Sequence, residues 1–396
     1  MEKIPTPEFI YIEECDFNQF PTGGVLSFSK QMIKVFGNRM ALVGIVTDDT
    51  QVGVWIEKEF QGVKFNFFGI LKTDIKLNKK PLIPARLTTY LALKRHLKSI
   101  EKIGVPIVFT RTPQFSIALK NSNFTNKSFC FAGTTNSVQI SRYPFLRFFS
   151  SYYEKILFNS LKTFNTIMAS ADKTEIKNLI ERSEGKFENK IIHSFPTRYD
   201  ENIFKLYDKT LCRNDLNLPL NKTIFIVTGR LSWIKGWKLI IDSFHSYIQN
   251  YNSESILIFL GDGEEKPKML EYTQELKLND NIQIVGKVSS ETVSKYLNAA
   301  DIYVVGSFSE GWSNAMIEAL GCGKKIVSTN ISGASEMVIN GVNGYILENR
   351  DSEKMATLFD KCTKLTDGEL HSLELAKNYN LKTLKIDFEK ICLNKQ

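Results

Sequence analysis

Apolar and polar residues follow two patterns along the chain, which together predict β-strands separated by helices. Short apolar runs such as residues 40–46 and 223–227 suit buried strands, whereas residues 25–36 and 237–249 have the length and spacing of helices. Strands that alternate with helices form parallel sheets covered on both faces, so the predicted fold class is α/β with doubly wound sheets. Further strands are expected at 9–13, 63–68, 106–110, 128–131, 165–169, 190–193, 301–305 and 326–328, and further helices at 85–100, 144–163 and 314–320.

The chain is long enough for two domains that each bury a core. It has 396 residues, of which 43% are hydrophobic and 24% charged, as in globular proteins. A polar segment between residues 194 and 221, with Pro196 and Pro219 near its ends, interrupts the alternation. Six strand–helix units follow between residues 223 and 365. We therefore expect a domain boundary in the polar segment.

One buried carboxylate is expected in residues 306–327. The helix at 314–320 is apolar almost all round except for Glu318, and a buried carboxylate is costly unless something bonds it. Glu310 lies eight residues earlier, in a loop at the carboxyl end of a strand, where ligands bind in open α/β sheets. On its own, this pattern fits two interpretations equally well. Either the two carboxylates bind a ligand, or Glu318 caps a neighbouring loop and Glu310 is a solvated turn residue.

The loop between these carboxylates predicts an anion site. Ser313 is a candidate N-cap of the helix that begins at Asn314, and the amides of Gly311, Trp312 and Ser313 point out of the helix N-terminus. Asn314 itself is a further candidate contact to a substrate.

A second loop, bounded by Gly229 and Gly236, follows the strand at 223–227. Arg230 and Lys235 place two cations in this loop. Arg grips phosphate oxygens bidentately and Lys adds a point charge. Such pairs in loops are usually solvated, so this loop predicts a phosphate site only in combination with the segment 306–327.

The combination Gly229-Arg-Leu-x-x-x-Lys-Gly236 and Glu310-Gly-x6-Glu318-Ala319 resembles the retaining glycosyltransferases of family four, which have the GT-B fold. The resemblance is strong over residues 220–350 and thinner before them. Three further matches keep the family's order: Gly261-Asp-Gly263, Gly286-Lys-Val288 and Gly341-x-x-Gly344. The pair Gly23-Gly24 fits the family's glycine pair near the N-terminus.

The resemblance implies two Rossmann-like domains that face an interdomain cleft. Residues 1–195 would form the acceptor-side domain, 196–375 the nucleotide-sugar donor domain, and 376–396 a helix that crosses back to the first domain. Retention without an obvious nucleophile implies front-face attack, in which the leaving phosphate oxygen helps to deprotonate the acceptor. The implied roles are Arg230, Lys235 and the amides after Glu310 for the donor diphosphate, Glu318 for the ribose, Glu310 for the sugar ring, Gly286 to Val288 for the base, and Gly23, Gly24 and Arg111 for the acceptor side.

The sequence departs from the family at several places. Ser332-Gly-Ala-Ser-Glu336 lacks the first glycine of the Gly-Gly-x-x-Glu element, and Pro196-Thr-Arg198 replaces Pro-Asn-Gly. Many relatives have a histidine near Arg111, and this chain has none there. Trp233 and Trp237 fit a packing role and a ligand contact equally well.

Composition and short motifs indicate which cofactors and which cellular compartment to expect. No Asp-x-Asp pair occurs, so we expect a nucleotide sugar as substrate and neither a metal ion nor another cofactor. Six scattered cysteines argue against a disulfide framework or a zinc site. We expect neither a signal peptide nor a membrane-spanning run, because residues 1–20 carry five acidic side chains and no apolar core, and no apolar run approaches about 18 residues. A reducing cytoplasm is the simplest location.

Three alternatives stay open. A dinucleotide-dependent oxidoreductase would need Gly-x-Gly-x-x-Gly after its first strand, and Gly261-Asp-Gly-Glu-Glu-Lys266 lacks the third glycine. A GT-B sugar phosphorylase would share the donor motifs. A non-catalytic partner that binds a nucleotide or glycan would keep the fold without turnover.

Charge is distributed unevenly. The chain carries +8, but residues 1–200 hold 28 Lys and Arg against 18 Asp and Glu, and residues 75–153 hold 13 basic side chains against Glu101 alone. Aromatic residues interleave with this charge at 142–149 and 152–153. No nucleic-acid-binding motif accompanies it, and no obligate protein partner is evident. We expect an anionic membrane surface as partner, with solvated helix faces as the alternative, and a role in making a surface polysaccharide or lipid-linked oligosaccharide.

Overall fold

The computed structural model describes residues 6–21, 23–74, 83–136, 138–139 and 143–395. The chain folds into two compact units: unit 1 comprises Met1–Pro196 and Leu384–Gln396, and unit 2 comprises Thr197–Thr383. The sequence predicts limits at residues 195 and 375. The second limit lies later because the segment after residue 375 still belongs to unit 2, where the ring of Tyr379 lies 5.8 Å from that of Trp312.

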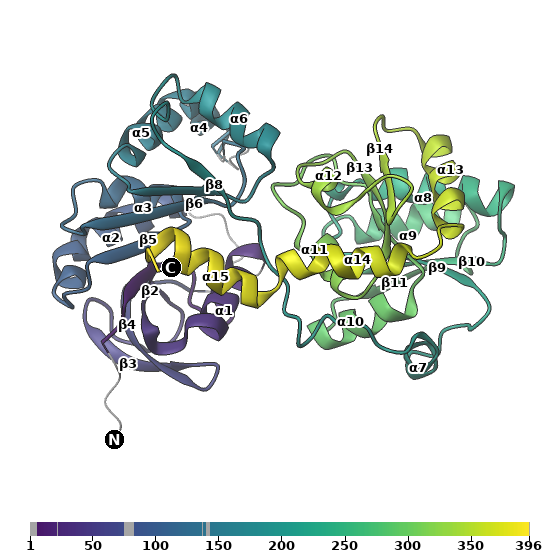
Figure 1. Ribbon diagram of the computed structural model, residues 1–396, viewed down its shortest axis with the longest axis horizontal. Coiled ribbons are helices and arrows are strands. Elements are labelled where there is room, and N and C mark those ends of the chain that lie inside the picture. The colour runs from purple at the N-terminus through teal and green to yellow at the C-terminus, as the bar shows by residue number, and fades with distance from the viewer. Residues whose placement is uncertain (1–5, 22, 75–82, 137, 140–142, 396) are drawn as a thin grey trace. The chain divides into compact units, whose positions relative to one another are not determined.

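Unit 1 is built on an eight-stranded sheet with the order β3-β4-β2-β1-β5-β6-β7-β8 (Figure 1). Neighbouring strands are parallel except for β3 and β4. The strands are β1 (Phe9–Ile12), β2 (Met40–Val46), β3 (Trp55–Phe60), β4 (Val63–Lys72), β5 (Ile107–Thr110), β6 (Asn126–Phe131), β7 (Thr166–Ala169) and β8 (Ile192–Ser194). The helices are α1 (Gly24–Phe36), α2 (Ala85–Glu101), α3 (Pro113–Leu119), α4 (Pro144–Arg147), α5 (Ser150–Leu161), α6 (Lys173–Arg182) and, from the other end of the chain, α15 (Leu381–Cys392).

Alternate residues of β1 belong to the cores on the two faces of this sheet. Ile10 and Ile12 join a core that includes buried residues of α2, α3, α5 and α6. Phe9 and Tyr11 point to the opposite face, as the two-residue period of a strand requires. There the ring of Phe388 in α15 lies 5.0 Å from the ring of Phe9. The last helix therefore completes the core of unit 1.

Three elements of unit 1 differ from the sequence-based expectation. Strand β3 is not predicted, because charged residues occupy half of it, yet an antiparallel strand at the edge of a sheet tolerates charge. The short helix α3 is also not predicted. The single helix expected at 144–163 is wrong: it is interrupted at Phe148 and Phe149, so that α4 and α5 are separate.

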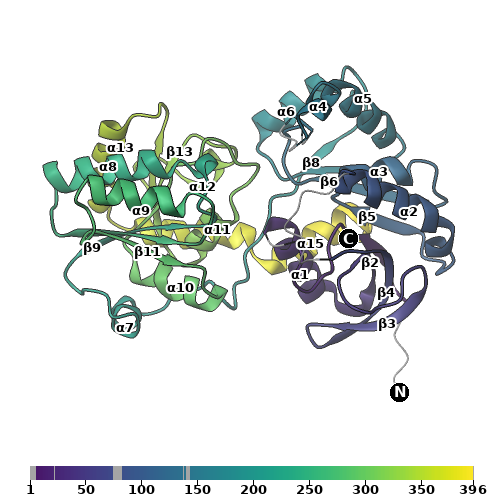
Figure 2. The ribbon, with the colours of Figure 1, turned by 180° about the vertical axis from the view of Figure 1, so that it is seen from behind.

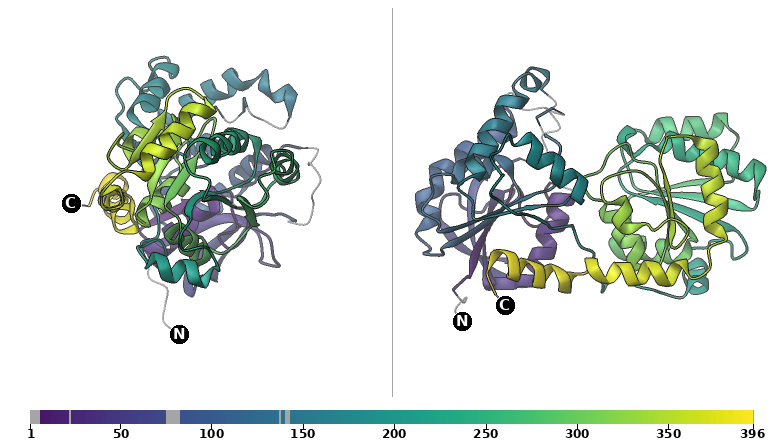
Figure 3. Two further views of the ribbon diagram at one scale, coloured as in Figure 1. Left: turned by 90° about the vertical axis from the view of Figure 1, so that its right-hand side faces the viewer. Right: turned by 45° about the horizontal axis from the view of Figure 1, so that its top comes forward.

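Unit 2 is built on a six-stranded parallel sheet with the order β11-β10-β9-β12-β13-β14. Figure 1 labels most of these strands, and Figure 3 shows the ribbon of this unit in two further views. The six predicted strand–helix units are confirmed, and α7 precedes them. The strands are β9 (Thr223–Thr228), β10 (Ser255–Leu260), β11 (Ile282–Gly286), β12 (Ile302–Val305), β13 (Lys325–Thr329) and β14 (Gly344–Leu347). The helices are α7 (Lys209–Asp215), α8 (Trp237–Asn250), α9 (Lys266–Glu275), α10 (Ser290–Ala299), α11 (Asn314–Gly321), α12 (Ala334–Met337), α13 (Ser352–Thr363) and α14 (Gly368–Ala376).

Helices cover both faces of the unit 2 sheet, with α8 and α9 on one side and α7 and α10 on the other (Figure 2). Phe225 of β9 packs with residues of α8, α9 and α13, whereas its neighbours Ile224 and Ile226 pack with residues of α10, α11 and α14. Both faces of β9 are therefore buried, and only its carboxyl end is available to a ligand.

Two further expectations concern the described residues as a whole. The six cysteines are buried and form no disulfide. In the part of the chain that the structure describes, every helix is too short or too polar to cross a membrane.

Candidate functional site

The loops that follow β9, β10 and β11 are joined by backbone hydrogen bonds at the carboxyl edge of the unit 2 sheet. The amide of Gly229 donates to the carbonyl of Leu260 at 2.9 Å, and the amide of Gly261 donates to the carbonyl of Gly286 at 2.8 Å. A Cβ atom on Gly261 would lie 1.8 Å from the carbonyl oxygen of Gly229. Glycine is therefore required for this close approach of two loops.

A second close approach brings the loops after β9 and β12 together. Gly236 adopts the left-handed conformation, with φ of 63°, and a Cβ atom there would lie 1.9 Å from the carbonyl oxygen of Gly306. The amide of Phe308 donates to the carbonyl of Ile234 at 2.8 Å. These contacts hold Lys235 beside the loop that carries Glu310.

Lys235 and Glu310 form an ion pair across these two loops. The Lys235 Nζ lies 2.5 Å from the Glu310 Oε1, and the Ser307 hydroxyl donates to the same oxygen at 2.7 Å. The Glu310 side chain is 14% exposed. Two residues from the two predicted motifs, 75 positions apart, thus meet at one point.

The ion pair lies in the wall of an open pocket at the carboxyl ends of β9 and β12, whose empty space is about 430 Å³ when the adjoining solvent is included. Arg230 also lines this pocket, but its side chain is largely exposed and its Nε donates to Glu264 at 3.2 Å. Of the other predicted contacts, Ser313 lines the pocket too. Two cations, one carboxylate and a loop before a helix therefore border one space, which suits an anionic ligand with hydroxyl groups.

Glu318 is half-buried on α11. Within the described ranges its carboxyl group makes neither a side-chain hydrogen bond nor an ion pair, so it does not cap a neighbouring loop. Burial raises the pKa of Glu318 to about 8. Burial also raises the pKa of the nearby Tyr303 phenol, and the charges of Glu318 and Glu310 raise it further. A half-buried carboxyl group with a raised pKa and no partner among the described residues is available to a ligand, although Glu318 is not part of the pocket wall around Lys235 and Glu310.

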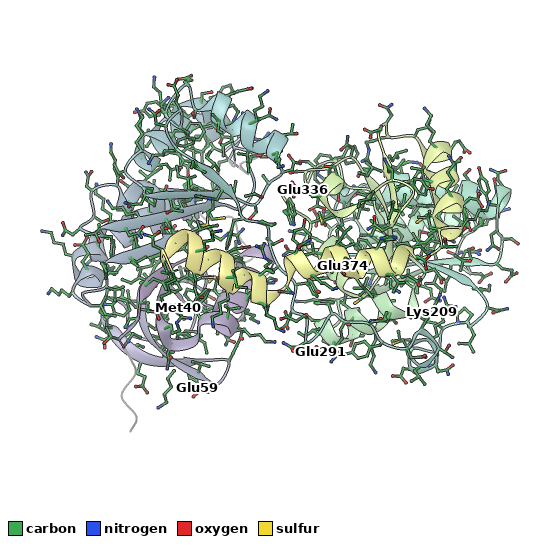
Figure 4. All side chains as sticks on the ribbon, viewed as in Figure 1. Met40, Glu59, Lys209, Glu291, Glu336 and Glu374 are labelled. Atoms are coloured by element: carbon green, nitrogen blue, oxygen red, sulfur yellow. The ribbon has the colours of Figure 1, made fainter. Side chains whose placement is uncertain are left out.

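The start of α11 differs in detail from the expectation. Ser313 occupies the predicted N-cap position, although its hydroxyl makes no capping hydrogen bond with the described residues. The Trp312 Nε1 and the Asn314 Oδ1 are buried atoms that find no hydrogen-bond partner in the part of the chain that the structure describes. Trp312 packs closely on Gly333, where an added Cβ atom would lie 2.7 Å from its ring. Gly333 precedes α12, which carries Glu336 (Figure 4).

The remaining predicted contact of unit 2 is the loop after β11. Gly286 has a positive φ of 98°, and its carbonyl already accepts the amide of Gly261. Val288 is partly exposed in the same loop. The backbone at Gly286 is thus already part of the structure that joins the loops, and its contact with a base stays a prediction.

The predicted residues of unit 1 lie at the carboxyl edge of its own sheet. Gly23 has φ of 113° and precedes Gly24, the first residue of α1, and no atom of the described residues lies within 4 Å of the Cβ position of either. Arg111 is only 7% exposed, with its guanidinium 4.0 Å from the ring centroid of Phe28 and its Nη2 3.3 Å from the Ser170 hydroxyl. Arg111 is therefore buried against the ring of Phe28 within unit 1, and its predicted contact on the acceptor side stays a prediction.

Two carboxyl groups at the end of β1 were not predicted as site residues. Thr112 donates to Glu13 through a short hydrogen bond, and Gln114 donates to Glu14 at 2.6 Å. Burial raises the pKa of both carboxyl groups. The signal in the sequence is an acidic pair directly after a buried strand, which ends at Ile12, and the glycosyltransferase motifs do not include it.

In the comparison with known proteins, a glycosyltransferase family model matches residues of unit 2. Residues 208–379 match the model of the family described as Glycosyl transferases group 1. An uncharacterized glycosyltransferase of Methanocaldococcus jannaschii is 30% identical over 177 residues, which is 43% of this chain and 45% of that protein. The chain thus spans about half the length of this relative.

Solved structures match nearly the whole chain. Sucrose-phosphate synthase from Thermosynechococcus elongatus has a TM-score of 0.73 at 16% identity over 98% of both chains. HepE of Anabaena, in complex with UDP and glucose, has a TM-score of 0.71 at 15% identity over 98% of this chain and 100% of that one. At these identities the likeness shows the fold alone, which is the GT-B fold with two α/β domains.

Proposed function

We propose that the chain is a group 1 glycosyltransferase that moves a sugar from a nucleoside-diphosphate sugar to a glycan or lipid-linked acceptor, with retention at the anomeric carbon. The family match over residues 208–379 supports the transferase class. The observation that carries the proposal is the Lys235–Glu310 ion pair in the wall of the open pocket. It joins the two motifs that the donor chemistry requires.

Arg230, Lys235 and the amides at the start of α11 would hold the donor diphosphate. Breaking the glycosidic bond leaves negative charge on the departing diphosphate, and fixed positive groups stabilise that charge most when they are already in place. Lys235 is fixed by Glu310 at 2.5 Å. Among the described residues Arg230 pairs with the exposed Glu264, and exchanging this partner for phosphate costs little because the pair is solvated.

Glu318 would accept hydrogen bonds from the ribose hydroxyls of the donor, and Glu310 would contact the transferred sugar. A vicinal diol donates two hydrogen bonds, and a carboxylate accepts them on its two oxygens. HepE was solved with UDP and glucose, which supports a uridine nucleotide as the first donor to test. The proton of the acceptor hydroxyl would pass to the leaving phosphate oxygen as the new glycosidic bond forms.

We also propose that the enzyme acts at an anionic membrane surface in surface polysaccharide or lipid-linked oligosaccharide synthesis. Side chains of α4, α5 and the residues between them support this: Phe148 is 89% exposed, and Phe145, Phe149, Tyr152 and Arg147 are exposed as well. Soluble proteins rarely gather large apolar side chains on one surface without a partner. Of the 13 basic residues between residues 75 and 153, Lys76, Lys79, Lys80 and Arg142 lie outside the described residues.

The donor assay comes first. The protein is mixed with UDP-, GDP- and ADP-glucose and with free UDP, and its melting temperature is measured, because a bound ligand raises it by mass action. Turnover of the stabilising donor, with the anomeric configuration of the product read by NMR, tests the reaction. Activity that requires free phosphate and a sugar phosphate would favour a phosphorylase instead. Binding without any turnover would favour a non-catalytic partner.

A further inference from the structure

Two large aromatic side chains are exposed beside the Lys235–Glu310 pair. Trp233 is 62% exposed and Phe308 is 51% exposed. Their ring centroids lie 5.5 Å apart with the ring planes tilted by 50°. Trp233 precedes Lys235 by two residues, and Phe308 precedes Glu310 by two. Each aromatic ring therefore stands on the same loop as one member of the ion pair.

The two rings are held rigidly although they are exposed. The amide of Phe308 donates to the carbonyl of Ile234, next to Trp233, at 2.8 Å. The guanidinium of Arg350 lies 3.7 Å from the centroid of the Phe308 ring, and its Nη1 donates to the carbonyls of Gly306 and Ser307 at 2.8 and 3.0 Å. Arg350 therefore braces one face of Phe308, and Phe308 in turn braces Trp233.

Neither ring lies in the wall of the open pocket, although Lys235, Ser307 and Glu310 do. The rings therefore lie outside the pocket wall, on the two loops that carry Lys235 and Glu310. Glu310 is the residue assigned to the transferred sugar, so a second substrate that attacks this sugar comes close to these two loops and to their exposed rings.

We propose that Trp233 is the platform on which a saccharide ring of the acceptor stacks, with Phe308 as its brace; this rests on the proposed transfer from a nucleotide sugar. The face of an aromatic ring is electron-rich, and one face of a pyranose presents C–H groups that complement it. A sugar ring also needs polar partners for its hydroxyls, and the Lys235 and Glu310 loops supply them at the edge of the platform. A lipid chain would need an apolar surface without these charges beside it.

Binding can be measured without knowing the natural acceptor. The probes are methyl β-glucoside, methyl β-galactoside and methyl N-acetyl-β-glucosaminide, each followed by saturation-transfer NMR on the full-length protein with and without UDP. The variants are Trp233→Leu, which removes the aromatic face, and Trp233→Phe, which keeps a smaller one. Phe308→Leu tests the brace, and Tyr251→Leu, at an exposed aromatic residue after α8, is the matched control.

We expect at least one glycoside to bind the parent through its C–H protons. Trp233→Leu should weaken that binding about fivefold or more, the counterpart of about 1 kcal/mol, whereas Trp233→Phe should lose less and Tyr251→Leu nothing. UDP affinity, measured by calorimetry, should stay unchanged in every variant. If the parent protein does not bind UDP, that result refutes the proposed function and not the stacking platform.

Three results would overturn the platform. The first is a parent protein that binds UDP but none of the glycosides. The second is a Trp233→Leu variant that binds the glycosides as tightly as the parent. The third is a Trp233→Leu variant that keeps glycoside binding but loses thermal stability, which would assign the ring to a contact within the chain.

Discussion

Lys235 and Glu310 are 75 residues apart in sequence, and the Nζ and Oε1 atoms of their side chains lie 2.5 Å apart. The pair forms because β9 and β12 are neighbours in a parallel sheet, so the loops that follow them meet at one edge. In the absence of substrate, the two opposite charges compensate each other within a partly buried pocket. Substrate binding would add a diphosphate to Lys235 and a sugar to Glu310.

We predict that Lys235→Ala lowers sugar transfer by about 10²-fold or more, because it removes a fixed cation from the developing charge of the leaving group. Glu310→Gln should lower turnover while the nucleotide still binds. The measurement is the steady-state rate together with nucleotide affinity. Lys238→Ala removes a nearby exposed lysine that pairs with Asp242 instead, and this control should keep full activity. Near-normal rates in both Lys235→Ala and Glu310→Gln would refute the assignment.

The pH dependence of donor binding should report on Glu318. Burial raises the pKa of this carboxyl group to about 8, so at pH 6.5 the free protein holds it protonated. Ribose hydroxyls donate to the ionised form, and UDP-glucose affinity should therefore rise between pH 6.5 and 8.5. Glu318→Gln should bind UDP-glucose more weakly and without this rise. Calorimetric titrations at several pH values would decide, and an identical pH profile in the parent and the variant would contradict the ribose role.

Glu318 should also affect stability with a definite sign. Its pKa in the folded protein is about 8, above the ordinary value of 4.5, so between these values the unfolded chain loses a proton that the folded chain keeps. Stability should therefore fall as the pH rises from about 5 to 8. Glu318→Gln removes this contribution, and its melting temperature relative to the parent should increase across that window. A difference that is constant with pH would show that the carboxyl group titrates normally.

The close approach of the loops after β9 and β10 predicts that Gly261→Ala is strongly destabilising. Its Cβ atom would overlap the carbonyl oxygen of Gly229 at 1.8 Å, and forced overpacking typically costs about 1–3 kcal/mol or more. Gly62→Ala is the matched control, because Gly62 also has a positive φ but no atom within 4 Å of its Cβ position. Thermal unfolding should show a larger loss for Gly261→Ala. Equal losses would mean that backbone strain alone, and not the contact, requires glycine.

Much of the fold and part of the site follow from the sequence. The strand–helix alternation predicts the unit 2 sheet because both faces of its strands are buried, as the two cores around β9 show. The same alternation places the loops of Arg230, Lys235 and Glu310 at the carboxyl ends of strands. The sequence predicts less about which side chains pair, because pairing depends on rotamers and on the neighbouring strand. The ion pair of Lys235 with Glu310 and the burial of Arg111 under Phe28 are of this kind.

The polar groups of unit 1 show a second limit of prediction from the sequence. Glu13 and Glu14 follow a buried strand, but an acidic pair in that position fits a solvated turn equally well. Only the arrangement of β1 beside β5 brings Thr112 to Glu13 and buries its carboxyl group. Likewise, the charged strand β3 carries no hydrophobic alternation strong enough to predict it, since its strand character comes from pairing with β4.

Transfer should not require a divalent metal ion, because Arg230, Lys235 and the amides before α11 supply the positive charge that a metal would otherwise provide at the diphosphate. Among the described residues there is no group of three or more His, Cys, Asp or Glu side chains that could hold a metal ion. The rate measured with excess EDTA should equal the rate without it. A loss of activity that Mg²⁺ or Mn²⁺ restores would contradict this prediction.

Membrane association should depend on the exposed aromatic residues between α4 and α5 together with the basic charge of residues 1–200. Each Lys or Arg near an anionic surface contributes about 1 kcal/mol, and interfacial aromatic rings add apolar burial. The protein should therefore co-sediment with phosphatidylglycerol vesicles at low salt, less at high salt, and little with phosphatidylcholine vesicles.

The double variant Phe148→Ser with Phe149→Ser should lose much of this binding. Leu270→Ser, at an exposed residue of α9 in unit 2, should keep it. Equal partitioning into both lipids, or no binding at low salt, would exclude an electrostatic membrane contact while leaving the transferase proposal intact.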